Sequence, residues 1–243
     1  MAAARMIARA DGTRLACRQV AGAGPGLIFL PGYRSDMAGS KAAALLDWGV
    51  TAGRAVTLFD YAGCGASEGE FAEETLESWL GDALTILDAA TEGPQIVIGS
   101  SMGGWLMLHL ALLRPHRVAG LVGIAAAPDF TDWGFTPDQK AVLLRDGIVF
   151  EPNAYGPEPT PTTLGFWKAG QAMRLLDGDI AIDCPVRLLH GQRDPDVPWQ
   201  LALDLAARLR SADVQVALIK EGDHRLSRPG DIALLIATVA ALG

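Results

Sequence analysis

The sequence predicts an α/β protein with a mostly parallel central sheet that helices cover on both faces. Short apolar runs alternate with longer segments of helical periodicity, which is typical of repeated strand–helix units. The apolar runs are nearly continuous, as expected for strands that are buried on both sides. Half of the 243 residues are hydrophobic and a fifth are charged, so the chain can bury a large core. We therefore expect a single domain over residues 1–243.

Six strands and five helices are expected after a short N-terminal hairpin. The hairpin is predicted around Asp11-Gly12, because this dipeptide favours a tight turn between antiparallel strands. The predicted strands are Leu27–Leu30, Ala55–Phe59, Ile96–Ile98, Gly120–Ala125, Val186–Leu189 and Val214–Ile219. The predicted helices are Lys41–Ala52, Thr75–Ala90, Met102–Leu113, Trp199–Leu209 and Asp231–Leu242.

One segment, from about residue 129 to residue 183, interrupts the alternation of strands and helices. It is rich in Pro, Trp and Gly and separates two predicted strands by about fifty residues. Connections of this length inside a compact domain are usually functional, so we predict an insertion that acts as a lid over the active site. A helical excursion packed on the sheet edge is the alternative. The aromatic residues that would give the lid an apolar surface are Trp133, Phe135, Phe150, Tyr155, Phe166 and Trp167.

Charge and cysteine content limit the partners and the compartment. The formal charge of −8 argues against nucleic acid or an anionic membrane surface as a partner. No apolar run approaches the ~20 residues of a membrane span. Cys17, Cys64 and Cys184 are odd in number and widely spaced, which predicts free thiols in a reducing compartment. The N-terminus lacks the apolar core of a signal peptide, so we expect a cytoplasmic protein.

A nucleophile motif follows the predicted strand Ile96–Ile98. Residues 99–103 read GSSMG, which matches G-x-S-x-G, and a segment of helical periodicity comes directly after them. The turn in this motif is so tight that side chains at its first and last positions would collide, so both positions are Gly. Such a turn holds the serine oxygen clear of the sheet and near the positive end of the helix. Ser101 is the candidate nucleophile, because Ser100 does not have Gly at the flanking positions.

A serine hydroxyl needs a neighbouring base, because it is almost fully protonated at neutral pH. In serine hydrolases with this strand–turn–helix motif, the chain order is serine, then acid, then histidine. His109 and His116 lie in or directly after the helix that follows Ser101, and His190 closes a strand ahead of any acid on its loop. Only His224 follows the last predicted strand. We therefore predict His224 as the base.

The acid of this arrangement is expected in the loop that follows Val186–Leu189. The loop offers Asp194 and Asp196, and the spacing H-G-x-x-D-x-x-V-P favours Asp194. Asp196 is more simply explained as a solvated carboxylate. Asp129, just after another predicted strand, is the third option. Asp194 would hold the required tautomer of His224 and stabilise its imidazolium form.

An oxyanion formed at Ser101 would need two backbone N–H donors. We assign these to Met102, directly after the nucleophile, and to Tyr33 in the loop after Leu27–Leu30, where Gly32 lets the backbone come close. The sequence contains no phosphate-binding loop, zinc-protease motif or dinucleotide motif. Its four scattered histidines and separated cysteines do not form a metal-ligand pattern. We therefore expect no cofactor and no metal.

Four segments, FDYAGCGASEG, GSSMGGWLMLH, RLLHGQRDPDVPW and DHR, carry a resemblance to a known family. Together they resemble a branch of the α/β-hydrolase superfamily, that of the mitochondrial palmitoyl-protein thioesterases, which are also called mycophenolic acid acyl-glucuronide esterases. The likeness runs in the same order from about Leu27 to the C-terminus. It implies the α/β-hydrolase fold, with Ser101 as nucleophile, Asp194 as acid and His224 as base. The insertion matches poorly, and no transit extension precedes the matched part, in keeping with the cytoplasmic expectation.

These residues predict a two-step acyl transfer through an acyl-enzyme. An apolar lid favours a hydrophobic acyl group, so we expect an S-acyl thioesterase or carboxylesterase acting on a small-molecule ester or an acylated peptide. A small-ester, lactone or acyl-glucuronide esterase is the alternative, favoured if Arg34 or Arg225 lies near the pocket. A hydrolase-fold ligand receptor without efficient turnover is the rival from another class. An aminopeptidase is disfavoured, because no acidic pair for an amino terminus stands out.

Overall fold

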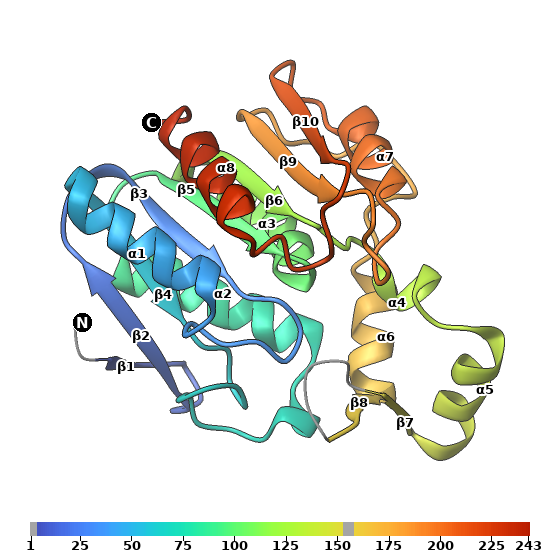
Figure 1. Ribbon diagram of the computed structural model, residues 1–243. Helices are drawn as coiled ribbons and strands as arrows, with labels where there is room; N and C mark the ends of the chain where they lie inside the picture. The colour runs from blue at the N-terminus through green and yellow to red at the C-terminus, as the bar shows by residue number, and fades with distance from the viewer. Residues whose placement is uncertain (1–3, 153–157) are drawn as a thin grey trace.

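The computed structural model describes residues 4–152 and 158–243. Its centre is an eight-stranded sheet with the strand order β1-β2-β4-β3-β5-β6-β9-β10 (Figure 1). β2 runs antiparallel to both of its neighbours and the remaining pairs are parallel, so the predicted mostly parallel sheet is confirmed. The strands are β1 Arg5–Ala8, β2 Arg14–Val20, β3 Ala23–Leu30, β4 Arg54–Phe59, β5 Gln95–Ser100, β6 Val118–Ile124, β9 Val186–Gly191 and β10 Val214–Ile219.

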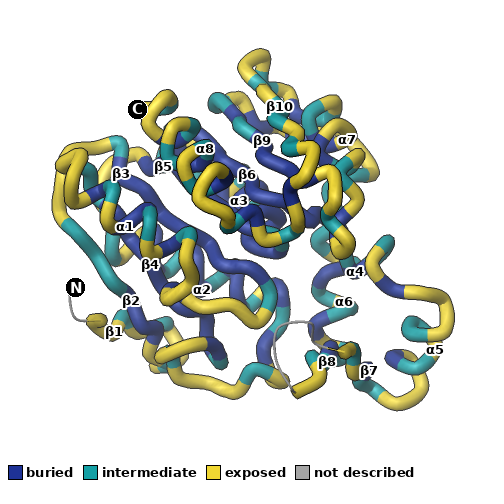
Figure 2. The backbone as a smooth tube through the Cα atoms, viewed as in Figure 1, coloured by how far each residue is buried: buried dark blue, intermediate teal, exposed yellow. Residues whose placement is uncertain are grey.

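Helices cover both faces of this sheet. α1 and α8 lie on one face, and α2, α3 and α7 pack on the other (Figure 1). Successive residues of β3 alternate between the two cores: Leu27 packs with the α1 and α8 side, and Ile28 with the α2 and α3 side. The strands are therefore buried on both faces, as Figure 2 shows. The helices are α1 Ser40–Ala52, α2 Leu76–Ala90, α3 Met102–Leu113, α7 Gln200–Arg208 and α8 Pro229–Ala240, with short 3₁₀ turns at Phe71–Glu73 and Pro115–Arg117.

Local signals explain where these elements begin and end. Thr75 caps α2 through a reciprocal pair of hydrogen bonds with Ser78, and α1 ends at Gly53 in the left-handed conformation. The predicted α3 and β10 coincide with the observed elements, and the predicted hairpin forms β1 and β2. β3 begins at Ala23, earlier than predicted, because its backbone pairing with β4 continues beyond the apolar run.

The chain between β6 and β9 forms the insertion, which lies beyond the carboxyl ends of the strands, at the lower right of Figure 1. β7 and β8 pair there as a separate two-stranded antiparallel sheet. Sequence periodicity predicts none of these elements, and Tyr155 lies outside the described residues. The elements are α4 Phe130–Trp133, α5 Pro137–Asp146, β7 Ile148–Glu151, β8 Thr160–Thr163 and α6 Leu164–Ala172.

Aromatic residues of the insertion pack inward against the body of the protein. Phe166 is 1% exposed, and its ring lies 4.9 Å from that of Tyr33 and 5.6 Å from that of Trp79, measured between centroids. Phe135 is buried in a small core of its own within the insertion. The expectation that such side chains form an apolar lid surface is therefore wrong for these two residues, because they contribute to packing.

Candidate active site

The turn between β5 and α3 carries Ser101 at the carboxyl edge of the sheet. Ser101 has φ 54° and ψ −119°, a conformation that costs energy for a residue with a side chain. A Cβ on Gly99 would overlap the backbone of Gly103, and a Cβ on Gly103 would overlap the carbonyl oxygen of Leu30. The steric reason given for the two glycines of the motif is thereby confirmed. The turn leaves Ser101 at the N-terminus of α3, as predicted.

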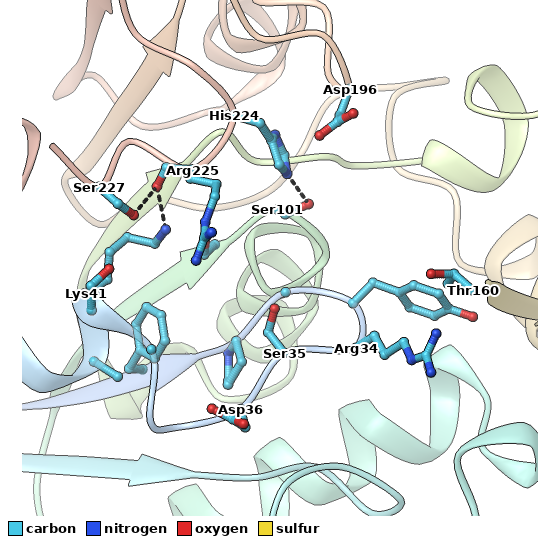
Figure 3. A pocket seen from close by; sticks show the side chains of 18 of the residues that line it. Arg34, Ser35, Asp36, Lys41, Ser101, Thr160, Asp196, His224, Arg225 and Ser227 are labelled. Carbon is cyan, nitrogen blue, oxygen red and sulfur yellow. Dashed lines mark hydrogen bonds between the residues drawn. The ribbon is translucent and has the colours of Figure 1, made fainter. Parts of the chain in front are cut away.

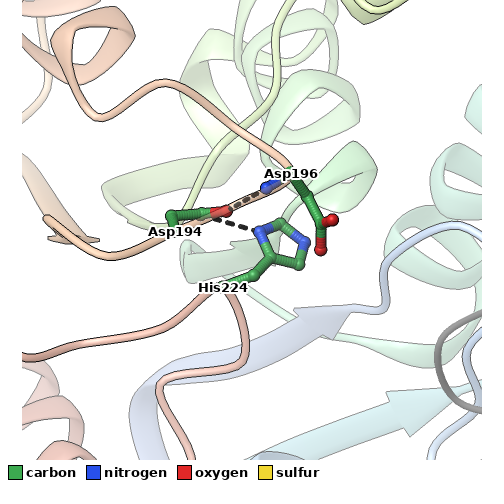
Figure 4. A group of neighbouring side chains, drawn as sticks. All are labelled: Asp194, Asp196 and His224. Atoms are coloured by element: carbon green, nitrogen blue, oxygen red, sulfur yellow. Dashed lines mark hydrogen bonds and ion pairs between the residues drawn. The ribbon is translucent and has the colours of Figure 1, made fainter.

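Hydrogen bonds connect the three residues that the sequence predicts as nucleophile, base and acid. His224 Nε2 lies 3.1 Å from the Oγ of Ser101 (Figure 3). His224 Nδ1 lies 2.8 Å from Oδ2 of Asp194 (Figure 4). Asp194 follows β9 and His224 follows the neighbouring parallel strand β10, so both loops leave the same edge of the sheet. The side chain of Asp194 is fully buried and that of His224 is 15% exposed. This geometry can carry a proton from the serine to the imidazole.

Both oxygens of the Asp194 carboxylate have hydrogen-bond donors around them. Oδ1 accepts from the backbone N–H groups of Asp196 and Val197, each at 2.8 Å. Oδ2 accepts from His224 and lies 3.2 Å from Nε2 of His190. Burial opposes ionisation, but donation from the two histidines and the Val197 N–H outweighs it and holds the pKa of Asp194 below its ordinary value. Asp194 is therefore an ionised and well-oriented acceptor.

The other two acids considered from the sequence have different surroundings. Asp129 is 3% exposed, and its carboxylate accepts from the backbone N–H groups of Leu175 and Leu176. These hydrogen bonds connect the beginning of the insertion with the segment that follows α6. Asp196 is exposed beside His224, and its backbone N–H donates to Asp194 (Figure 4). The hydrogen bond of the His224 imidazole Nδ1 goes to Asp194.

The same three side chains also have the proximity of a metal-ligand group. One potential ligand atom each from Asp194, Asp196 and His224 lies within 4.8 Å of the other two (Figure 4). However, both Asp194 oxygens already accept hydrogen bonds, and one of the donors is the His224 imidazole itself. A cation would have to replace those donors. The group therefore fits a proton relay better than a metal site.

The backbone groups assigned to the oxyanion remain available in this structure. Among the described residues, no hydrogen bond uses the N–H of Tyr33 or that of Met102. Met102 is the first residue of α3, where helix geometry leaves the N–H without an internal acceptor. The loop of Tyr33 lies against the nucleophile turn, since a Cβ on Gly32 would come within 3.3 Å of the Cβ of Ser101. Both donors can therefore face a carbonyl oxygen bound at Ser101.

A pocket of about 670 Å³ opens at Ser101 and His224. It lies between the sheet edge and the insertion, which contributes Glu151, Pro152, Glu158 and Thr160 to the lining. None of the described aromatic side chains of the insertion lines it, in contrast to the apolar lining that the sequence suggested. The charged residues that line it are Arg34, Asp36, Lys41, Glu151, Glu158, Asp196 and Arg225.

Lys41 reaches from the first turn of α1 to the loop that carries His224. Its Nζ donates to the backbone carbonyl oxygen of Arg225 at 2.5 Å. Burial and the Arg225 guanidinium lower the pKa of Lys41 to about 8, against the opposing charges of Asp223 and Asp231. Figure 3 shows the side chains of Lys41 and Arg225 on the same side of Ser101. Cationic groups are thus present at one end of the pocket.

Comparison with known proteins supplies the family. A family model described as the alpha/beta hydrolase fold matches residues 39–150. The palmitoyl-protein thioesterase ABHD10 of Mus musculus is 44% identical over 236 residues, which cover 95% of this chain and 79% of the mouse protein. The Homo sapiens protein of the same name is 41% identical over 235 residues, which cover 95% of this chain and 77% of the human protein. The chain belongs to the α/β-hydrolase family.

This α/β-hydrolase is also similar to solved structures over almost its whole length. The alpha/beta hydrolase domain-containing protein 10 from mouse matches with a TM-score of 0.93 and 42% identity, covering 99% of this chain and 98% of that one. A structure from Agrobacterium vitis S4 matches with a TM-score of 0.92 and 39% identity, covering 100% and 98%. The predicted fold, the resemblance and the assignment to the hydrolases are confirmed.

The prediction of a cytoplasmic location is wrong by the same comparison. Five curated relatives of this hydrolase, at 41–44% identity, carry the word mitochondrial in their names. Unpaired cysteines indicate a reducing environment and do not distinguish one such compartment from another. Within residues 4–152 and 158–243, no helix is both long enough and apolar enough to cross a membrane.

Two side chains at the site of this hydrolase are not singled out by the sequence. His190 lies beside the carboxylate of Asp194, although the order of residues along the chain excludes it as the base. The spacing H-G-x-x-D could have pointed to it, because it places His190 at the strand end that begins the acid loop. Lys41 gives no comparable signal, since it meets Arg225 only through the tertiary fold.

Proposed function

We propose that this α/β-hydrolase cleaves S-acyl thioester and carboxylic ester bonds, with Ser101 as nucleophile, His224 as base and Asp194 as acid. The observation that carries the proposal is the hydrogen-bond chain from the Oγ of Ser101 through both ring nitrogens of His224 to Asp194, at the mouth of a pocket. Two relatives named palmitoyl-protein thioesterase support thioesters as the substrate class.

Acylation of the serine is the first half of the proposed reaction. The Oγ of Ser101 attacks the acyl carbonyl carbon while its proton passes to Nε2 of His224. Asp194 stabilises the imidazolium and keeps its own charge. The oxyanion accepts hydrogen bonds from the backbone N–H groups of Tyr33 and Met102. The carbon–sulfur or carbon–oxygen bond then breaks, and the proton on Nε2 goes to the departing thiolate or alkoxide.

Deacylation repeats these steps with water as the nucleophile. His224 takes a proton from water, the hydroxide adds to the acyl carbon, and the same two N–H groups receive the oxyanion. The bond to the Oγ of Ser101 breaks, and the proton returns to that oxygen. The products are a carboxylic acid and free enzyme.

The proposal includes the insertion as a cover for the acyl group, within a single domain. Glu151, Pro152, Glu158 and Thr160 all line the pocket, and each belongs to the insertion or its connecting loop. Outside the insertion, apolar residues of the lining include Phe29, Pro31 and Ala42. In this proposal the acyl chain lies along these residues. This part of the pocket supports a preference for hydrophobic acyl groups.

A matched chain-length series tests the proposal. Wild type and Ser101→Ala are assayed on p-nitrophenyl esters and on S-acyl peptides from acetyl to palmitoyl. We expect kcat to fall by at least about 10⁴-fold in the variant, and wild type to prefer octanoyl or longer chains. Faster turnover of acetyl substrates would contradict the acyl preference. Wild type no faster than the variant on any substrate would favour a receptor without turnover.

A second candidate function is hydrolysis of small esters, lactones or acyl glucuronides that carry a carboxylate. The observation that favours it is the set of cationic side chains in the pocket lining, Arg34, Lys41 and Arg225. Arg225→Ala should then raise KM about tenfold for an acidic ester and leave KM for its neutral analogue unchanged. Equal changes in KM for both esters would exclude recognition of the substrate carboxylate by Arg225.

A further inference from the structure

A second histidine lies behind the acid of the proposed triad. His190 is at the carboxyl end of β9 and is 1% exposed. Its Nε2 lies 3.2 Å from Oδ2 of Asp194 and 3.1 Å from the backbone carbonyl oxygen of Val197. The proposed reaction gives this imidazole no part, since it makes no contact with Ser101. A fully buried polar ring with both neighbours in the acid loop calls for an explanation.

The surroundings of this ring fix its tautomer. Both neighbours of Nε2 are acceptors, so Nε2 must carry the hydrogen. Nδ1 is buried and has no hydrogen-bond partner among the residues that the structure describes. A hydrogen on Nδ1 would therefore be a buried N–H without an acceptor, which is costly. The geometry thus favours the tautomer in which Nε2 is the donor.

His190 completes a closed set of contacts around the acid. Val197 donates its N–H to Oδ1 of Asp194, while its carbonyl oxygen accepts from His190. Oδ2 of Asp194 stands between the Nε2 of His190 and the Nδ1 of His224. The carboxylate cannot rotate without losing one of these donors. Donors fixed on both oxygens favour a single orientation and the ionised form.

We propose that His190 is a positioning residue of the reaction, which holds Oδ2 of Asp194 in line with Nδ1 of His224. This inference rests on the proposed function of the triad and assigns to it a fourth residue. Without the Nε2–H of His190, which lies between Oδ2 of Asp194 and the carbonyl oxygen of Val197, the buried carboxylate would lose one of its four polar neighbours and gain freedom to turn. His224 would then spend less time in the tautomer and orientation that accept the proton of Ser101.

Two substitutions of His190 distinguish the effect of its hydrogen-bond donor from the effect of its packing. His190→Gln places an amide N–H near the position of Nε2, whereas His190→Met has similar length and no donor. We expect kcat to fall about 10- to 100-fold in His190→Met with little change in KM, and to recover most of this loss in His190→Gln. The low-pH limb of kcat/KM should steepen in His190→Met alone, because its Asp194 protonates more readily.

The controls distinguish failure of this inference from failure of the proposed function. Wild type that outpaces Ser101→Ala, with His190→Met as active as wild type, would overturn the role of His190 and leave the triad intact. Equal losses in His190→Gln and His190→Met would also overturn it, since packing alone would then matter. Wild type no faster than Ser101→Ala would overturn both.

A measurement on the wild-type protein covers the case in which the variants do not fold. Long-range ¹H–¹⁵N correlation spectra at pH 7.5 report which ring nitrogen of each histidine carries hydrogen. We expect His190 to show a protonated Nε2 and a bare Nδ1. A protonated Nδ1 with a bare Nε2 would overturn the inference, because Nε2 could not then donate to Asp194.

Discussion

In the proposed triad, the environment of Asp194 determines how His224 acts on Ser101. Its carboxylate is buried, receives donors on both oxygens and has a pKa below the ordinary value. A carboxylate with these properties stabilises an imidazolium and does not take its proton. Ser101 contributes through its strained backbone, which fixes the direction of the Oγ relative to the ring.

The pH dependence of catalysis follows from this assignment. A carboxyl group with a depressed pKa is ionised at every pH above its usual range and protonates only below it. Asp194 therefore stays ionised across the usual range of carboxyl groups and above it, and its protonation contributes nothing to a loss of activity there. We expect log kcat/KM for a neutral ester to rise with a slope of one on the acid side. A slope near two would show that Asp194 protonates in the same range.

Single residues of the site differ in how far the sequence predicts them. Ser101, Asp194 and His224 can be named because chain order and motif spacing restrict the choice at each step. The part played by His190 cannot be deduced in this way, because the same spacing selects only the aspartate. Lys41 is beyond sequence reasoning, since its partner oxygen belongs to Arg225, far along the chain.

The turn between β5 and α3 is the element on which the site depends. It packs against the end of β3, which brings the proposed nucleophile, Ser101, close to the loop that is proposed to bind the oxyanion. The side chain of Tyr33 connects this loop to the insertion, since its hydroxyl donates to the carbonyl oxygen of Pro161 at 2.8 Å. Movement of the turn would therefore disturb Ser101 and the oxyanion donors together.

Gly103→Ala tests the close packing of this turn. The added Cβ would overlap the carbonyl oxygen of Leu30, so the backbone must shift. We expect a loss of about 1–3 kcal/mol in the free energy of unfolding and a drop in kcat of about tenfold or more. Urea denaturation and steady-state kinetics measure the two effects.

Gly81→Ala in α2 is the matched control for that substitution. No atom lies within 4 Å of the Cβ that it would add, and alanine favours a helix over glycine. It should raise stability by up to about 1 kcal/mol and leave kcat unchanged. Equal behaviour of the two alanine variants would contradict the steric account of the turn.

Elements of the sheet are predicted from sequence far better than those of the insertion. The strands are apolar runs and the helices have apolar faces, which the buried parallel sheet requires. β8 reads TPTT, and a pattern with proline and no apolar alternation does not predict a strand. It forms because β7 pairs with it and because Tyr33 contacts its backbone.

The residues that line the pocket come from distant parts of the chain. The lining comes from the loops after β3, β5, β9 and β10, from α1 and from the insertion, and the strand order brings these segments together. The sequence composition of the insertion suggested an apolar lining, but Phe166 faces the core and charged side chains face the pocket. Composition could not separate inward from outward side chains, because that depends on the tertiary packing.

The N-terminal hairpin is held to the rest of the molecule by a partly buried ion-pair network. Arg9 of the loop after β1 contacts Asp82 at 3.1 Å and Glu74 at 3.4 Å, and the Asp82 side chain is fully buried. Burial raises the pKa of Asp82 to about 6, against the hydrogen bond from the Ala62 N–H and the interaction with Arg9. Above that pH, the negative charge of the buried Asp82 carboxylate is therefore compensated by Arg9.

Arg9→Met should destabilise the protein in a pH-dependent manner. At pH 7.5 an ionised Asp82 would lose its cation, and we expect a loss of about 2–3 kcal/mol in the free energy of unfolding. At pH 5 the carboxyl of Asp82 is mostly neutral and the loss should be smaller. Arg14→Met is the control: its ion pair with Glu68 is exposed, so its loss should destabilise the protein much less than Arg9→Met does. Equal losses at both pH values would contradict this account.

Labelling with a fluorophosphonate, which reacts covalently with activated serines, followed by peptide mass spectrometry, tests whether His224 and Asp194 activate Ser101. We expect one equivalent of label per chain, attached to Ser101, with complete loss of esterase activity. His224→Ala should label at least about 10³-fold more slowly. Label on Ser100 or another serine, or full labelling of Ser101 in His224→Ala, would contradict the assignment of nucleophile and base.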